Sequence, residues 1–197
     1  LRATYLRQAE IGYLKEKLST NAYPGRGIVL GVTPNGKTAV REYVKHVGAV
    51  CILPLTDTGE VVLERQFRYP FHTVITEIPA GKLDSPDEDV HEAALRELRE
   101  ETGLKAEKMT LLTSVLTTPG FCTEKIAIYL AQGLSQGETH PDEDEFLELF
   151  KIPVDELTHM IMRGEIVDGK TQAAVMRAAE VNADIVLLAK NVDAIYT

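Results

Sequence analysis

The part of the chain that decides the fold is residues 81–104, which read GKLDSPDEDVHEAALRELREETGL. The segment SPDE at 85–88 has the form of a capping box, with a serine oxygen that accepts from the N3 amide and a proline at N1. Gly103 stands where glycine forms a left-handed cap at the end of a helix. The pattern therefore predicts a helix that starts at Pro86 and ends at Gly103.

Three glutamates give this predicted helix an unusual acidic face. Glu97 and Glu101 continue its apolar stripe at helical spacing, and carboxylates that face a packed surface are costly unless paired. Glu100 lies about 60° around the helix from Glu97, so the three carboxylates can converge on a hard cation such as Mg²⁺ or Mn²⁺. A solvated, salt-bridged face is the alternative. We interpret Arg96, four residues from both Glu92 and Glu100, as intrahelical charge support.

The same segment resembles the Nudix box almost throughout, including REL at 96–98, EE at 100–101 and GL at 103–104. One departure is that six residues, rather than the family's five, separate Gly81 from Glu88. Glu88 keeps its proper distance from Arg96, which places the extra residue in the loop before the helix. The resemblance implies an α/β fold, namely a Nudix-type α/β/α sandwich with a mixed sheet, plus a small N-terminal β unit.

Further landmarks look like those of the ADP-ribose pyrophosphatase subfamily: QFRYP at 66–70, EIPAG at 77–81, TPGF at 118–121 and DEDEF at 142–146. Pro119 lies sixteen residues after Gly103, a placement associated with that subfamily, although an ordinary strand-ending turn is the alternative. The resemblance implies hydrolysis of ADP-ribose to AMP and ribose 5-phosphate. Hydrolases of other ADP-sugars or GDP-sugars, and a catalytically silent nucleotide-binding module, remain alternatives.

The resemblance also assigns a metal site and a general base. The metal would be Mg²⁺, for which Mn²⁺ can substitute. Its ligands would be a backbone carbonyl and three carboxylates, those of Ala80, Glu97, Glu100 and Glu101. Glu143 would activate the attacking water, with Glu100 as a second catalytic carboxylate. Glu124 and Glu145 compete for the role of base, and a merely solvated acidic loop is the alternative reading of Glu143.

Substrate contacts are expected along the whole resembling region. Arg68 would bind phosphate, because a guanidinium fork suits it, although a surface ion pair is the alternative. The other expected substrate-binding residues are Glu77, Arg41, Glu42, Gly120, Phe121 and Glu124. Glu42 is expected to contact the base, unless it and Arg41 simply decorate an edge strand.

Strand and turn patterns organise the rest of the chain. Residues 26–33 and 38–45 flank an Asn35-Gly36 pair and predict a hairpin, and residues 49–55 and 60–67 predict a second one. Further strands are predicted at 73–78, 109–117, 125–131 and 145–152, and helices at 154–163 and 170–188. We expect residues 1–46 to form an N-terminal β unit exchanged between the subunits of a homodimer, and residues 47–197 to form the catalytic domain.

Composition narrows the function classes. The chain has 197 residues, 44% hydrophobic and 26% charged, which is ordinary for a globular protein. A net charge of −9 argues against nucleic-acid binding, and the absence of a membrane-length apolar run argues against a membrane partner. The start of the sequence lacks a secretory apolar centre, so we expect a cytoplasmic protein whose partner is a small nucleoside-diphosphate sugar. Cys51 and Cys122 are interpreted as structural thiols.

Overall fold

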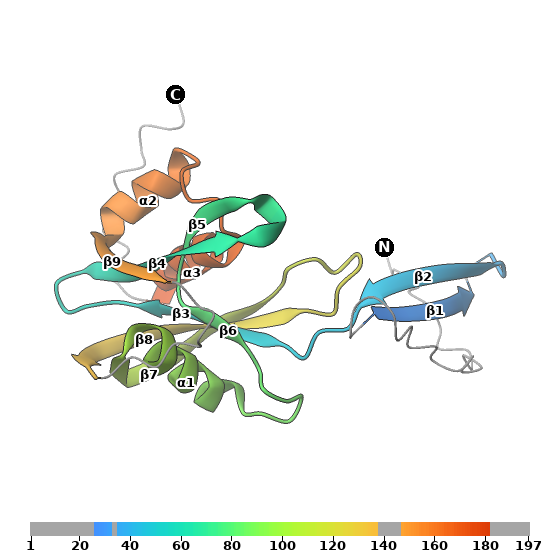
Figure 1. Ribbon diagram of the computed structural model, residues 1–197, viewed down its shortest axis with the longest axis horizontal. Helices are drawn as coiled ribbons and strands as arrows, with labels where there is room; N and C mark the ends of the chain where they lie inside the picture. The colour runs from blue at the N-terminus through green and yellow to red at the C-terminus, as the bar shows by residue number, and fades with distance from the viewer. Residues whose placement is uncertain (1–25, 33–34, 138–146, 182–197) are drawn as a thin grey trace. The chain divides into compact units, whose positions relative to one another are not determined.

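The protein is described by a computed structural model over residues 26–32, 35–137 and 147–181 (Figure 1). It separates into two compact units, which are described one at a time. The first unit comprises residues 1–47 and 116–124, and the second comprises residues 48–115 and 125–197. In the described part of the chain, no helix is both long and apolar enough to span a membrane.

The first unit contains the predicted N-terminal hairpin. Strands β1 (Arg26–Val32) and β2 (Thr38–Val44) pair in antiparallel fashion, which confirms that prediction. Gly36 has a φ of 79°, a left-handed conformation that glycine adopts without strain. The segment 117–124 pairs with the end of β2, where the Val44 amide donates to the Phe121 carbonyl at 2.7 Å.

The second unit is built on two sheets. The four-stranded sheet has the order β6 (Ala80–Lys82), β3 (Ala49–Pro54), β8 (Lys125–Gln136) and β7 (Leu104–Leu116). The three-stranded sheet has the order β5 (Thr73–Glu77), β4 (Glu60–Arg68) and β9 (Glu148–Pro153). A short 3₁₀ turn, η1 (Tyr69–Phe71), joins β4 to β5. Since β3 is parallel to β8 and antiparallel to β6, the first of these sheets is mixed, as predicted.

The second predicted hairpin is wrong, because β3 and β4 lie in different sheets. Only one bridge, between Leu55 and Val61, joins the two segments. All six residues of β3 are buried, and its two edges are already paired with β6 and β8. The turn at Gly59, with φ of 78°, therefore leads the chain into the other sheet.

Helices cover both faces of the central strand β3, because alternate residues of β3 belong to two different apolar cores. Successive side chains of a strand point to opposite faces. Cys51 and Leu53 belong to the apolar core that contains residues of α3 (Gly169–Val181) and α2 (Val154–Met162). Val50 and Ile52 belong to a second core that contains residues of α1 (Val90–Thr102). The predicted α/β/α sandwich is thereby confirmed.

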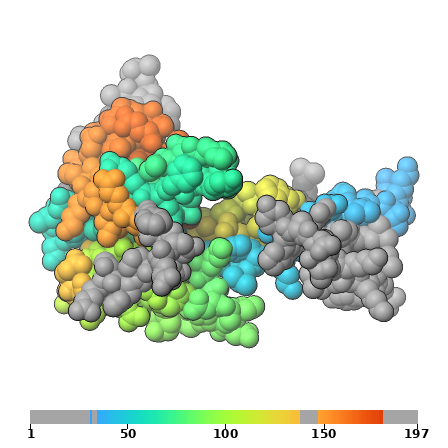
Figure 2. Space-filling view, in the orientation of Figure 1, coloured from blue at the N-terminus to red at the C-terminus, as the bar shows by residue number. Residues whose placement is uncertain are grey.

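The outer surface of the second unit is visible in the space-filling view. There α2 and β9, in orange, lie beside the turquoise and green surface of β4 and β5 (Figure 2). The Cys51 thiol lies in the apolar core of this unit, and burial raises its pKa to about 12. Both cysteines are free thiols, and Cys51 is thus held in its neutral form.

The boundaries of several elements differ from the sequence prediction. The helix predicted from Pro86 begins instead at Val90, because Asp89 is its N-cap and accepts from the amides of His91 at 2.9 Å and Glu92 at 3.1 Å. The end at Gly103 is confirmed, with φ of 70° and a bond from its amide to the Arg99 carbonyl. Strand β7 starts at residue 104 instead of 109, and β8 extends to residue 136. The predicted helix beyond residue 181 lies outside the described residues.

Candidate metal and phosphate site

Two glutamates of α1 are packed against the backbone of β6. Glu97 and Glu101 are buried, at 8% and 5% exposure. The Ala80 amide donates to Glu101 Oε2 at 2.9 Å. A Cβ built on Gly81 would lie only 1.9–2.2 Å from the carboxylate atoms of Glu97, so a glycine is required for this approach. The structure thus brings together Ala80, Glu97 and Glu101, three of the four predicted metal ligands.

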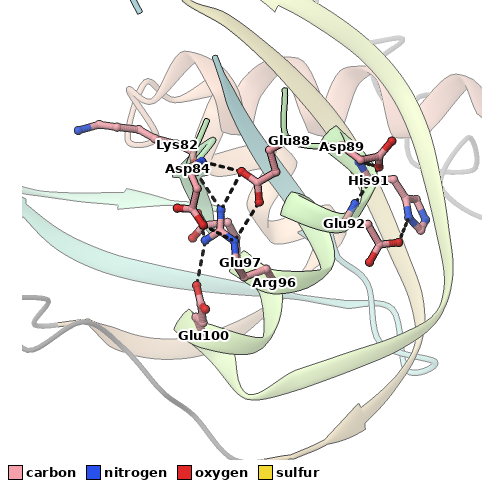
Figure 3. A network of polar contacts seen from close by, with 9 residues as sticks. All are labelled: Lys82, Asp84, Glu88, Asp89, His91, Glu92, Arg96, Glu97 and Glu100. Carbon is pink, nitrogen blue, oxygen red and sulfur yellow. Dashed lines mark hydrogen bonds and ion pairs between the residues drawn. The ribbon is translucent and has the colours of Figure 1, made fainter. Parts of the chain in front are cut away.

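The fourth predicted ligand, Glu100, belongs to a cluster centred on Arg96 (Figure 3). Arg96 Nη1 donates to Glu97 Oε1 at 2.8 Å and to Glu100 Oε2 at 3.0 Å. Its Nε donates to Glu88 Oε1 at 3.2 Å and lies 3.6 Å from an Asp84 carboxylate oxygen. We call Asp84, Glu88, Arg96, Glu97 and Glu100 the Arg96 cluster.

The Arg96 cluster corrects part of the sequence interpretation. Arg96 pairs with Glu100 as predicted, but its other predicted partner, Glu92, lies beside His91, with 3.5 Å between His91 Nδ1 and Glu92 Oε1. Glu88, expected to close a capping box, instead accepts from the Asp84 amide at 2.6 Å and binds Arg96. The Asp84 amide and the Arg96 guanidinium hold the pKa of Glu88 below its ordinary value.

The electrostatics of this cluster are dominated by carboxylates. Burial alone would lower the pKa of Arg96, but hydrogen bonds and charges from Glu88, Glu97 and Glu100 outweigh it and raise that pKa. The Arg96 guanidinium contacts four carboxylates. A fifth carboxylate, that of Glu101, belongs to the residue after Glu100. Among the ion pairs of the described residues, carboxylates in this cluster therefore outnumber the guanidinium that contacts them.

The donor set fits a hard divalent cation. Carboxylate and carbonyl oxygens are the ligands that Mg²⁺, Mn²⁺ and Ca²⁺ prefer. In the described residues, however, no three acidic, histidine or cysteine side chains are already arranged to hold a metal ion. Arg96 instead draws Glu97 and Glu100 to itself, and Glu101 accepts from a backbone amide. The assignment of the individual ligands stays a prediction.

A second polar site lies on β4 and β5, where two predicted substrate-binding residues form a bidentate ion pair. Arg68 Nε donates to Glu77 Oε1 at 2.7 Å, and Nη2 donates to Oε2 at 2.8 Å. The Glu77 side chain is 1% exposed, whereas that of Arg68 is 37% exposed. Burial would lower the pKa of Arg68, but its bond to Glu77 and nearby negative charges raise that pKa above the ordinary value.

Residues at the start of α3 complete this second site, and sequence reasoning missed them. Lys170 Nζ donates to Glu77 Oε2 at 2.8 Å and to Asp168 Oδ1 at 2.7 Å. The other carboxylate oxygen of Asp168 accepts from the Thr171 amide at 2.8 Å, which is N-cap geometry. An aspartate before a helical pattern was a usable signal for that cap. No local pattern links Lys170 to Glu77, 93 residues away.

The first unit carries the remaining described candidates. Arg41 and Glu42 are adjacent residues of β2 and both are exposed, while Gly120 and Phe121 lie in the segment 117–124. Glu124 accepts from the Thr117 hydroxyl and lies 3.5 Å from His46 Nε2. Glu124 is thus held within its own unit. Both loop candidates for the base, Glu143 and Glu145, lie outside the described residues.

Comparison with known proteins identifies the family. Residues 45–174 match the NUDIX domain family. The chain belongs to the Nudix family. It is 43% identical over 144 residues to "ADP-ribose pyrophosphatase" of Bacillus subtilis (strain 168), covering 72% of this chain and 77% of that protein. It is 44% identical over 159 residues to "Methanol dehydrogenase activator" of Bacillus methanolicus, covering 78% and 85%.

A solved structure extends the likeness to three dimensions. The "Crystal structure of ADP compounds hydrolase" superposes with a TM-score of 0.70 at 27% identity, covering 85% of this chain and 91% of that chain. The Nudix fold expected from residues 81–104 is therefore confirmed. As a Nudix hydrolase, the protein is of a kind that generally uses divalent metal ions.

Proposed function

We propose that this protein hydrolyses the pyrophosphate bond of a nucleoside-diphosphate sugar, with ADP-ribose as the first substrate and AMP and ribose 5-phosphate as products. The observation that carries the proposal is the buried Glu97 carboxylate packed on Gly81 within an excess of acidic side chains. Its place in the Nudix box and the names of the similar proteins support this reading.

The acidic face of α1 would hold the divalent metal. Mg²⁺ is the preferred ion and Mn²⁺ the substitute, with the Ala80 carbonyl and the carboxylates of Glu97, Glu100 and Glu101 as ligands. Such an ion neutralises the charge of phosphate oxygens and polarises them. The role of Arg96 is to restrain Glu97 and Glu100 together. Glu101 is restrained by the Ala80 amide, which ties the helix to β6.

Arg68 would bind a phosphate of the substrate. Its two bonds to Glu77 use Nε and Nη2, and no bond that it makes to described residues uses Nη1. A guanidinium fixed on one side can donate to a phosphate oxygen from the other. The other proposed substrate contacts are those of Glu77, Arg41, Glu42, Gly120, Phe121 and Glu124, and the N-terminal unit is proposed to be exchanged in a homodimer.

Hydrolysis also needs a proton acceptor outside the metal ligands. Glu143 is proposed to accept a proton from the attacking water as its oxygen bonds to one phosphorus. The bond from that phosphorus to the bridging oxygen then breaks, and the bridging oxygen leaves with the other phosphate. Glu143→Gln should lower kcat about 10²–10⁴-fold with little change in KM, whereas Glu145→Gln should do much less. The reverse result would move the base to Glu145, and no loss in either variant would move it to Glu124 or to the box.

A substrate panel tests the proposed function. ADP-ribose, ADP-glucose and GDP-mannose would each be incubated with the full chain and Mg²⁺, and the phosphorylated products counted. The proposal expects the highest kcat/KM for ADP-ribose, with AMP and ribose 5-phosphate in equal amounts. A higher kcat/KM for GDP-mannose would contradict the ADP-ribose assignment. Saturable binding without any cleavage would favour a catalytically silent nucleotide-binding module.

A further inference from the structure

The Glu77 carboxylate is the centre of a chain of contacts that ends on α3. Its Oε1 accepts from Arg68 Nε at 2.7 Å, and its Oε2 accepts from both Arg68 Nη2 and Lys170 Nζ, at 2.8 Å each. Glu77 is buried, and Lys170 is only 17% exposed. Two cations from different elements therefore fix one buried anion.

Lys170 is itself fixed by the first turn of α3. Asp168 accepts from Lys170 Nζ at 2.7 Å and from the Thr171 hydroxyl at 2.7 Å. The same hydroxyl oxygen accepts from the Ile78 amide at 3.0 Å. The start of α3 thus holds two consecutive residues of the chain, Glu77 and Ile78. Ala80, two residues after Ile78, donates its amide to Glu101.

Opposite charges favour the ionised forms of Lys170 and Asp168. Burial would lower the pKa of Lys170, but the charges of Asp168 and Glu77 and their hydrogen bonds raise it above the ordinary value. Burial would likewise raise the pKa of Asp168, but Lys170 and Thr171 hold it below the ordinary value. Glu64, opposite Glu77 in the β4–β5 register, also acts on Arg68 by its charge.

A carboxylate group rotates easily about its last torsion, because the sp³–sp² rotor has a broad energy profile. With Arg68 as its sole partner, Glu77 could rotate and carry the guanidinium with it. The third donor, Lys170, comes from a helix packed on the central sheet. Its bond therefore restrains Glu77 independently of β4.

We propose that Lys170, anchored by Asp168, is a positioning residue that fixes Glu77 and thereby presents Nη1 of Arg68 to a phosphate oxygen of the substrate. This inference rests on the proposed function, because it assumes a nucleoside-diphosphate substrate. Lys170 does not touch the substrate. Its effect reaches the substrate through Glu77 and Arg68.

Kinetics of Lys170 variants provide the test. K170M removes the ammonium group and keeps an unbranched chain, so KM for ADP-ribose should rise about tenfold with a smaller change in kcat. K170R restores a cation and should recover most of the affinity. K151M, a change at an exposed lysine of β9, is the matched control and should leave KM unchanged. A lower melting temperature with unchanged KM in K170M would make Lys170 a purely structural residue and overturn the proposal.

A double-mutant cycle shows whether the effect passes through Arg68. In an R68M background, K170M should raise KM no further, since the group that it positions is gone. Independent, multiplicative effects on KM would contradict the proposal. If K170M does not fold, D168N replaces it, because asparagine caps a helix as well as aspartate but holds Lys170 less firmly. D168N should then raise KM about threefold, and an unchanged KM would overturn the inference.

Binding of inorganic pyrophosphate separates this inference from the proposed function. Calorimetry with Mg²⁺ present would compare wild type, K170M, K170R and R68M. The inference expects about tenfold weaker binding in K170M and R68M and near-normal binding in K170R. If wild type cleaves no nucleoside-diphosphate sugar yet shows this pattern, the proposed function fails and the positioning role stands. If wild type cleaves ADP-ribose and K170M binds pyrophosphate normally, the positioning role fails alone.

Discussion

The Arg96 cluster and the Arg68–Glu77–Lys170–Asp168 network are both built from charged side chains, but they are balanced differently. In the Arg96 cluster, one guanidinium contacts four carboxylates. In the network, two cations are bonded to two carboxylates. Among the ion pairs of the described residues, carboxylates outnumber the guanidinium in the first group, which suits an added metal ion. In the second group each of the two carboxylates is bonded to a cation, which suits the rigid placement of a side chain. A metal ion should therefore matter to one and not to the other.

The largest effect is expected from the carboxylates of α1. Glu101→Gln removes charge with little change of shape, so kcat at fixed Mg²⁺ should fall by at least about 10²-fold while the protein stays folded. Glu92→Gln, on the exposed side of the same helix, is the control and should retain activity. Near-normal turnover of folded Glu101→Gln protein would contradict the assignment of the metal site to the acidic face of α1.

The close contact between Gly81 and Glu97 provides the next test. Gly81→Ala would place a methyl group within 1.9–2.2 Å of the Glu97 carboxylate. Glu97 must then move, and we expect kcat to fall about 10²-fold. Gly169→Ala is the matched control, because a Cβ there meets nothing within 4 Å. If Gly81→Ala kept full activity in the same assay, the contact would have no catalytic importance.

A comparison of two arginines on β4 tests the compensated network. Arg68 bonds a buried glutamate, whereas Arg65 bonds Glu148, which is 67% exposed. Arg68→Met should raise KM for ADP-ribose about 10–100-fold, as expected for a lost charge-assisted hydrogen bond to phosphate. Arg65→Met should change KM less than twofold, because exposed pairs contribute little. Equal effects on KM would show that burial of the partner does not matter.

The smallest effect is a pH-dependent change in stability at Asp168. Its pKa is lower in the folded protein than the unfolded value of about 3.9, so its contribution is present above that pH and is lost as the pH falls through the folded pKa. Asp168→Asn should lower the free energy of unfolding by about 1–3 kcal/mol at pH 7. The difference should shrink below pH ~4, as chemical denaturation at several pH values would show.

A surface pair controls for general effects of charge on stability. Glu165 pairs with Arg163, and both side chains are about half exposed. Glu165→Gln should leave the midpoint of unfolding nearly unchanged at pH 7, because solvent screens such a pair. If Asp168→Asn lowered the free energy of unfolding equally at every pH, the effect would come from packing instead of charge.

Local signals predicted much of the fold. Gly103 ended the box helix as expected, and Asn35-Gly36 formed a hairpin turn, because both depend on backbone conformations that neighbouring residues determine. The start of α1 was misplaced because two possible caps, Ser85 and Asp89, stand four residues apart. Glu88, which a capping box at Ser85 would use, is bound by the Asp84 amide and the Arg96 guanidinium instead.

Contacts between distant residues were beyond sequence reasoning. The assignment of β3 and β4 to separate sheets depends on β6 and β8 occupying both edges of β3. Arg68 and Glu77 were both selected as site residues, but their pairing requires the register of β4 and β5. Lys170, on α3, bonds Glu77 from 93 residues away. No sequence pattern predicts this contact.

The most direct test of the account is the Mg²⁺ concentration that gives half-maximal release of AMP from ADP-ribose. It would be measured in wild type, Glu101→Gln and Lys170→Met. The account predicts that Glu101→Gln raises this concentration about tenfold or more, and that Lys170→Met leaves it unchanged while raising KM for ADP-ribose. An equal shift of the Mg²⁺ requirement in both variants, or no shift in Glu101→Gln, would contradict the assignment of metal to one group and phosphate to the other.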